Sequence, residues 1–196
     1  MSASTPGSRL SRRAAVLVGA VFIATAIAVA VFVPSEEQTT APYVSVIPAL
    51  DTTVETREFS LEVTRVRLAD RVQTPEWVGD TNGVWLVVDI VFAPRLATAG
   101  IDGMLRIDDR IYLTSRRPDT AAVDQGAIGD PGLPWAGSML IEMPVSALRS
   151  SGADAAVVQF TVGETRLDGV LEYTIDLTEL ATQDSVTIFE PERVAP

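Results

Sequence analysis

VWLVVDIVF, residues 84–92, is the most apolar stretch of the chain outside its N-terminal segment. Successive side chains of a β-strand point to opposite faces of a sheet, and both alternating sets are largely apolar here. This pattern predicts a central strand that is covered on most of both faces. Asp89 is the exception, and we expect its carboxylate to face solvent or an arginine rather than to act in catalysis.

The residues before this stretch predict a second strand and a turn. Apolar residues alternate from Phe59 and then slip by one position before Leu68, as a β-bulge at residues 64–65 would produce. The sequence DTNG at residues 80–83 then predicts a turn, because Asp, Asn and Gly tolerate left-handed backbone conformations.

A hairpin is expected between residues 104–107 and residues 111–115. Two connections are possible around the sequence DDR at residues 108–110. A three-residue connection pairs Ile107 with Ile111, whereas a two-residue connection places Ile107 opposite a charged arginine. Burial of apolar pairs favours the three-residue connection.

The second half of the chain continues the β pattern. Residues 116–137 form a long connection rich in proline and glycine, and loops of more than about 15 residues are often functional or disordered. Further strands are expected at residues 138–143, 155–162, 171–177 and 184–189. About seven short strands without a long amphipathic helix indicate an all-β ectodomain, an immunoglobulin-like β-sandwich over residues 57–190 with a tail at 191–196.

Three segments carry a resemblance to known proteins. They are GVWLVVDIVF at residues 83–92, the hairpin over residues 105–113, and AGSMLIEMP at residues 136–144. Over residues 57–179 the chain resembles the immunoglobulin-like domains of unknown function found on actinobacterial membrane-anchored and secreted envelope proteins. The resemblance implies a β-sandwich in an extracytoplasmic setting and brings no catalytic residues. Some of those proteins are lipoproteins, whereas this chain has no cysteine for lipid attachment.

The N-terminal segment AAVLVGAVFIATAIAVAVFV, residues 14–33, carries no charge. As a helix it would be ~30 Å long, which matches the hydrocarbon core of a bilayer. Arginines precede it and all acidic residues follow it, so the positive-inside rule places the N-terminus in the cytoplasm. We therefore expect a cytoplasmic tail at residues 1–13, a single transmembrane helix at 14–33 and a linker at 34–56. The arginines are Arg9, Arg12 and Arg13.

A cleaved signal peptide is the alternative for this segment. The small residues AVA at positions 28–30 suit cleavage after Ala30, which would release the domain. The apolar run continues through Val33, however, and is longer than export signals require.

Composition excludes several function classes. The chain has no histidine and no cysteine, which removes Ser-His-Asp hydrolases, thiol nucleophiles and thiolate metal sites. Aspartates near the 104–115 hairpin do not follow EF-hand spacing, so no metal or other cofactor is expected. A net charge of −11 disfavours nucleic acid as a partner.

Four residues form the candidate partner surface. Trp77 and Trp135 are both expected in loops, where they either cover an end of the sandwich or face a partner. Arg116 and Arg117 follow the hairpin and either pair with nearby acids or contact an anionic wall polymer.

Together these features predict a non-enzymatic, single-pass membrane protein with an extracytoplasmic immunoglobulin-like module. Its expected role is protein binding or accessory function in a bacterial cell-envelope assembly. A secreted antigen or ligand binder released after Ala30 is the first alternative. The second is a carboxylate-dependent cell-wall hydrolase, since glycoside hydrolysis needs only two acidic side chains.

Overall fold

The computed structural model describes residues 50–162 and 170–195. The expected cytoplasmic tail, transmembrane helix and most of the linker lie outside these residues. No helix within the described part of the chain has the length and apolar character needed to cross a membrane.

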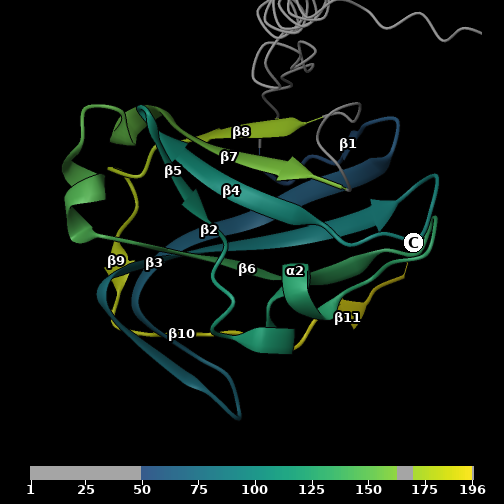
Figure 1. Cartoon of the computed structure of the whole chain (residues 1–196), viewed down its shortest axis with the longest axis horizontal. Coiled ribbons are helices and arrows are strands. Elements are labelled where there is room, and N and C mark those ends of the chain that lie inside the picture. The colour runs from purple at the N-terminus through teal and green to yellow at the C-terminus, as the bar shows by residue number, and fades with distance from the viewer. Residues whose placement is uncertain (1–49, 163–169, 196) are drawn as a thin grey trace, which may run out of the picture. The chain divides into compact units, whose positions relative to one another are not determined.

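Two β-sheets build the described region (Figure 1). The large sheet has the order β1-β2-β3-β6-β11, and two short strands, β9 and β10, also pair with β2. Its strands are β1 (Val54–Glu55), β2 (Phe59–Gln73), β3 (Val78–Pro94), β6 (Trp135–Met143), β9 (Thr182–Gln183), β10 (Val186–Thr187) and β11 (Glu192–Arg193).

The small sheet has the order β5-β4-β7-β8. Its strands are β4 (Asp102–Ile107), β5 (Arg110–Leu113), β7 (Ala156–Thr161) and β8 (Leu171–Ile175). The short helices of the described region are η2 (Asp119–Ala121), α2 (Val123–Gly126), η3 (Val145–Arg149) and η4 (Ala153–Ala155). The expected β-sandwich is therefore confirmed, and β2 to β8 are the strands that build its two layers.

The main core lies between the two sheets. Phe92 of β3, Phe160 of β7 and Tyr173 of β8 are among its fully buried side chains. The rings of Phe160 and Tyr173 pack edge to face with centroids 5.8 Å apart. Burial also raises the pKa of Tyr173 to about 12.

A second core covers part of the outer face of the large sheet. It consists of Ala69, Val72, Trp85, Val87, Ala121, Leu140, Val186 and Ile188, with Trp77 packed against it. Most of these residues come from β2, β3 and β6, but Ala121 comes from η2, and Val186 of β10 and Ile188 come from the C-terminal segment. Figure 1 shows the segment from β10 to β11 running along the side of the large sheet that faces away from the small sheet. This covering explains why both alternating sets of β3 are apolar.

The register of β2 and β3 confirms one sequence prediction and corrects another. The expected bulge is present as a register shift between Val63 and Arg65. The DTNG sequence, however, lies inside β3 rather than in a turn, and the hairpin turns at residues 74–77 instead. The same residues interrupt the pairing, because Ala69 faces Trp85 whereas Arg71 faces Asp80. The turn-forming residues therefore form an irregularity within the strand.

Gly83 fits this irregularity for a steric reason. A β-carbon at Gly83 would lie 2.1 Å from the carbonyl oxygen of Met143 on β6. Only glycine allows β3 to approach β6 so closely at this point.

The hairpin between β4 and β5 has a different register from the one expected. Ile107 lies opposite Arg110 and Leu105 opposite Tyr112, so the connection has two residues and not three. The prediction failed because it assumed that Ile111 and Leu113 are buried. Both are exposed, at 59% and 67%, on the edge strand β5.

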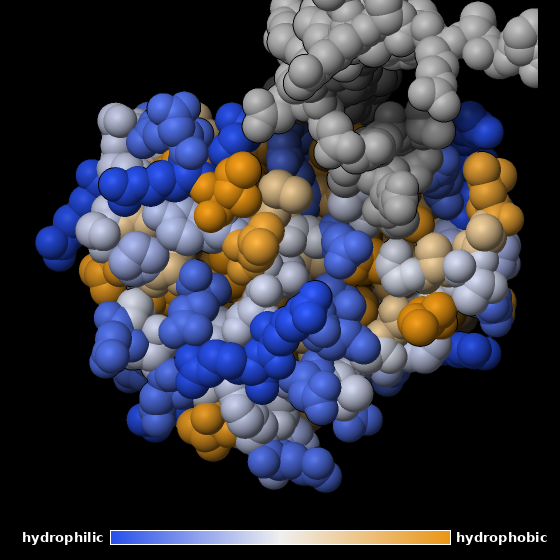
Figure 2. All heavy atoms as spheres, in the orientation of Figure 1, coloured by the Kyte–Doolittle hydropathy of each residue, from blue (hydrophilic) through white to orange (hydrophobic). Residues whose placement is uncertain are grey.

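The outer face of the small sheet is largely open to solvent. Figure 2 shows hydrophobic surface in the region of β5. Across β7, Arg106 of β4 lies 3.6 Å from the carboxylate of Glu172 on β8. Glu172 also accepts a hydrogen bond from Gln159 of β7 and is buried, although the strand pattern placed it on a wet face.

The long connection at residues 116–137 is held to the large sheet and to the loop between β3 and β4. It contains η2 and α2, and isolated bridges join Ala99 to Gly129 and Ala122 to Ser138. Two strands also lie outside the expected sandwich limits. β1 falls in the expected linker, and β11 falls in the expected tail and pairs with β6.

Candidate functional site

Trp77 lies in the turn between β2 and β3, as the sequence predicted. The turn is closed by hydrogen bonds between Thr74 and Trp77. The Thr74 amide donates to the Trp77 carbonyl at 2.7 Å, and the Trp77 amide donates to the Thr74 hydroxyl at 2.9 Å. The Trp77 ring packs edge to face on Trp85, with centroids 6.1 Å apart. It also covers Gly79, where a β-carbon would lie 2.1 Å from ring atom Cη2.

Arg117 lies next to both tryptophans. Its guanidinium carbon is 5.8 Å from the centroid of the Trp77 ring and 5.2 Å from that of Trp85, within the range of cation–π contacts. Its charge is paired with Glu142 of β6 at 3.1 Å, and it donates to the Asp80 carbonyl at 2.9 Å. Arg117 therefore pairs with a nearby acid, which is one of the two roles expected for it from the sequence.

Arg116 is exposed in the bend after β5. It acts electrostatically on Asp102 of β4. Burial raises the pKa of Asp102, the nearby Asp124 carboxylate raises it further, and Arg116 partly opposes both effects. Arg116 and Arg117 are thus adjacent in sequence but interact with different acids.

Trp135 is the first residue of β6 and not a loop residue, which corrects the sequence prediction. It pairs with Phe92 on one side and with Arg193 on the other, and the Arg193 guanidinium carbon lies 5.3 Å from its ring centroid. Seven residues of strand separate Trp135 from Glu142, which corresponds to about 23 Å. The structure therefore brings Trp77 and Arg117 together but leaves Trp135 at the other end of β6.

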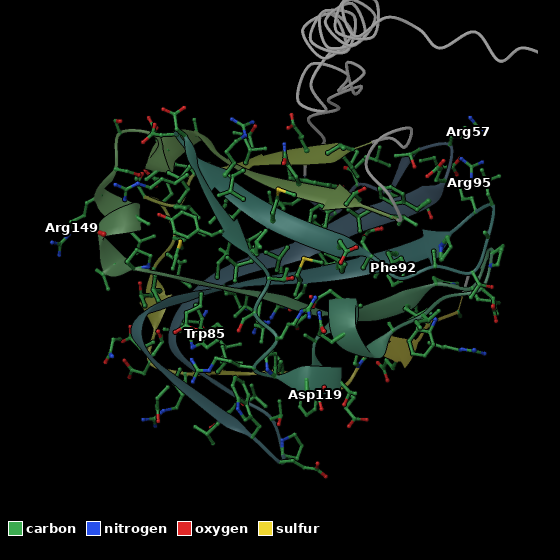
Figure 3. The ribbon with its side chains drawn as sticks, in the orientation of Figure 1. Arg57, Trp85, Phe92, Arg95, Asp119 and Arg149 are labelled. Atoms are coloured by element: carbon green, nitrogen blue, oxygen red, sulfur yellow. The ribbon has the colours of Figure 1, made fainter. Side chains whose placement is uncertain are left out.

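A groove of about 530 Å³ opens beside the Trp77 ring. This Trp77 groove is lined by Thr74, Pro75, Glu76, Trp77, Arg117, Pro118, Asp119, Thr120, Ala121, Phe189 and Glu190. Its volume falls in the range of ~300–1,000 Å³ that is typical of ligand pockets. Figure 3 labels Asp119 at its rim and Trp85, the ring on which Trp77 packs.

Phe189 is the member of this groove that sequence reasoning missed. Its side chain is 68% exposed, the largest exposed fraction among the described large hydrophobic residues. Its neighbour Ile188 is almost fully buried in the second core. The alternation at residues 186–189 predicted a strand, but nothing in it indicated that Phe189 would lie beside Trp77.

A second groove, of about 480 Å³, lies farther along the same outer face. Its lining includes Arg67 and Asp89, whose side chains meet at 2.7 Å. Ser138 of β6 donates a further hydrogen bond to Asp89 at 2.7 Å. Asp89 thus faces an arginine, which is one of the two surroundings expected for its carboxylate. Phe189 lines both grooves, so the C-terminal segment separates them.

The described residues contain no cluster of side chains suited to a metal ion. Among residues 50–162 and 170–195, no group of three His, Cys, Asp or Glu side chains could hold a metal ion. The chemistry that the Trp77 groove does offer is an apolar surface of rings with carboxylates at its rim.

Comparisons with known proteins give one structural likeness. A β-sandwich protein of uncharacterized function from Clostridium difficile 630 superimposes with a TM-score of 0.48 at 9% sequence identity. The alignment covers 72% of this chain and 99% of that chain. A scan against protein-family models and a search of curated proteins found no match.

Proposed function

We propose that the chain is a single-pass, non-enzymatic envelope protein. Its N-terminal helix holds an immunoglobulin-like module outside the membrane, where the module binds another protein through the Trp77 groove. The uncharged segment at residues 14–33, preceded by three arginines and followed by all the acids, supports the anchor and its orientation.

The strand order supports the immunoglobulin-like assignment. In immunoglobulin domains, strands A, B and E share one sheet, while C, F and G form the other, joined in some domains by C′. In this chain β2, β3 and β6 lie in the large sheet, and β5, β4, β7 and β8 form the small sheet in that order. Read in chain order, β2 to β8 correspond to A, B, C, C′, E, F and G.

The binding role rests on one observation. A mostly exposed phenylalanine and a half-buried tryptophan line the same groove, although they lie more than a hundred residues apart in sequence. Aromatic side chains are enriched in the centres of protein interfaces, where they supply much of the binding energy. The absence of histidine and cysteine from the chain further supports binding over catalysis.

Single cysteines test the topology, since the chain contains no cysteine of its own. Thr174 is exposed on β8, and Ser4 precedes the apolar segment. We expect a membrane-impermeant maleimide to label Thr174→Cys in intact cells and to label Ser4→Cys only after lysis. Labelling of Ser4→Cys in intact cells would overturn the proposed orientation.

Photo-crosslinking tests the binding role. A photoreactive amino acid at position 189 is compared with one at position 174, on the outer face of the small sheet. We expect position 189 to capture one envelope protein reproducibly in native membranes, and position 174 not to capture it. Equal capture from both positions would contradict a specific role for the groove.

The secreted alternative has its own observation, the AVA sequence at residues 28–30. Determining the N-terminus of the mature protein separates the two proposals. A protein that starts near Val31 and is found in the medium supports secretion, and an intact N-terminus in the membrane fraction supports the anchor.

A further inference from the structure

The walls of the Trp77 groove repeat one arrangement. The β2–β3 turn contributes Trp77 with Glu76, the segment at η2 contributes Pro118 with Asp119, and the C-terminal segment contributes Phe189 with Glu190. Each wall therefore combines an apolar ring with an adjacent carboxylate. Rings and acids thus surround the groove from three parts of the chain that are distant in sequence. The six residues are Glu76, Trp77, Pro118, Asp119, Phe189 and Glu190.

The negative charges at the rim of the Trp77 groove are not neutralised by the residues that line it. Arg117 is the cation among its lining residues, and the Glu142 carboxylate already neutralises it at 3.1 Å. The carboxylates of Glu76, Asp119 and Glu190 make no ion pair or side-chain hydrogen bond within the described residues. All three side chains are exposed, so they present negative charge to whatever enters the groove.

On the basis of the proposed function, we propose that the Trp77 groove binds an extended peptide segment in which arginine or lysine stands beside apolar residues. The apolar side chains of such a segment pack against Trp77 and Phe189. Its cations pair with the three rim carboxylates and lie close to the aromatic faces, where cation–π attraction adds to charge pairing. An acidic segment would meet three uncompensated charges of its own sign, so the groove selects against it.

Labelled peptides test this proposal on the full-length protein in lipid nanodiscs. One peptide combines arginine, leucine and proline, and a second has each arginine replaced by glutamate. We expect the fluorescence anisotropy of the basic peptide to rise on binding, and its affinity to fall as salt is added, because salt screens exposed charge pairs. The acidic peptide should not bind. Equal binding of both peptides, or no binding of the basic one, overturns the proposal.

Variants locate the binding to the groove. Phe189→Ala removes an exposed ring, and the triple variant Glu76→Gln, Asp119→Asn, Glu190→Gln removes the rim charge. Asparagine tolerates the left-handed φ of 50° at position 119. We expect each variant to lower the affinity for the basic peptide about tenfold. A control triple, Asp109→Asn, Asp154→Asn, Glu179→Gln, removes the same charge from other exposed sites and should leave affinity unchanged.

Equal losses in the rim variant and the control triple would mean that only net charge matters, and would overturn the proposal. Failure of the peptide proposal is distinguishable from failure of the proposed function. If crosslinking from position 189 captures a partner whose contacting segment lacks basic residues, the peptide chemistry is wrong and the binding role stands.

Discussion

The two outer faces of the sandwich differ in how they are covered. The outer face of the large sheet has its own core around Trp85, closed by η2 and by the C-terminal segment. The outer face of the small sheet is largely open to solvent: Thr174 on β8 is exposed there, although its neighbour on the same face, Glu172, is buried. The corresponding sequences differ in the same way: VWLVVDIVF is apolar in both sets, whereas LEYTI at residues 171–175 alternates. Double-sided apolarity in an antiparallel strand therefore indicates that another segment covers it.

One arginine–carboxylate pair from each outer face can be compared, because the two pairs differ in exposure. Arg67 and Asp89 meet at 2.7 Å with side chains 16% and 21% exposed. Arg106 and Glu172 are 3.6 Å apart, and the arginine is 40% exposed. Charge pairs gain strength as water is excluded from them, so the first pair should contribute more to stability than the second.

Removing the centre of the second core should give the largest effect. Trp85 is fully buried, and its indole nitrogen donates to the Gly79 carbonyl at 3.0 Å. We expect Trp85→Ala to lower the free energy of unfolding by about 3–5 kcal/mol. Thr174→Ala, on the open face, should change it by less than about 0.5 kcal/mol. Urea denaturation of the intact chain in mild detergent measures both, and similar values would refute the contrast between the faces.

The C-terminal segment should prove to be part of this core. Ile188 is 1% exposed, and we expect Ile188→Ala to cost about 2–4 kcal/mol because it leaves a cavity against the large sheet. Leu113→Ala is the matched control, since Leu113 is 67% exposed on β5. A cost below about 0.5 kcal/mol for Ile188→Ala would show that the segment is not firmly packed.

The two charge pairs can be compared by removing each arginine. Arg67→Ala leaves the half-buried Asp89 carboxylate with the Ser138 hydroxyl as its remaining side-chain partner among the described residues. We expect a loss of about 2 kcal/mol. Arg106→Ala should cost less than about 1 kcal/mol, because that pair is longer and its arginine is more exposed. Chemical denaturation ranks the two, and a larger loss at Arg106 would contradict the assignment.

The smallest effect on stability is expected from replacing Asp102. Burial and the Asp124 carboxylate raise the pKa of Asp102 above its ordinary value of 3.8, so the folded protein holds this proton more tightly than the unfolded chain. The stabilisation is complete below the ordinary value and is lost as pH rises through the raised one. At neutral pH the charged form opposes folding, and Asp102→Asn should therefore raise the melting temperature.

This gain from Asp102→Asn should disappear near pH 3, where the carboxyl is protonated in both states. Asp154→Asn serves as the control for loss of one exposed negative charge. An equal rise in melting temperature in both variants, or a rise that persists at low pH, would show that the raised pKa of Asp102 is not the cause.

The sequence pattern was sufficient to predict the sandwich and its central strand. Alternation identified β2 and its bulge because the packing of one face forces a period of two. The predicted β4–β5 register was wrong because it required burial of Ile111 and Leu113, whereas an edge strand can leave apolar side chains exposed.

The candidate site was harder to predict. Trp77 and Arg117 were identified as single residues, and the structure places them in contact with each other and with Trp85. The role of Phe189 could not be predicted, because it depends on which face of the large sheet the C-terminal segment crosses. Alternation within four residues gives the faces of that segment but not its position on the sheet.

The position of β10 in the chain also determines the order of assembly. Gln73 of β2 donates to the Thr187 hydroxyl at 3.0 Å, a contact that joins residues 114 positions apart. The strands that enclose the main core end with β8 at Ile175, whereas the second core needs Val186 and Ile188. A chain synthesised from its N-terminus can therefore close the main core before residues 182–188 are available, and until then the second core lacks the covering that Val186 and Ile188 provide. The second core is therefore completed after the main core, when the segment containing β10 packs against Trp85 and its neighbours on the large sheet.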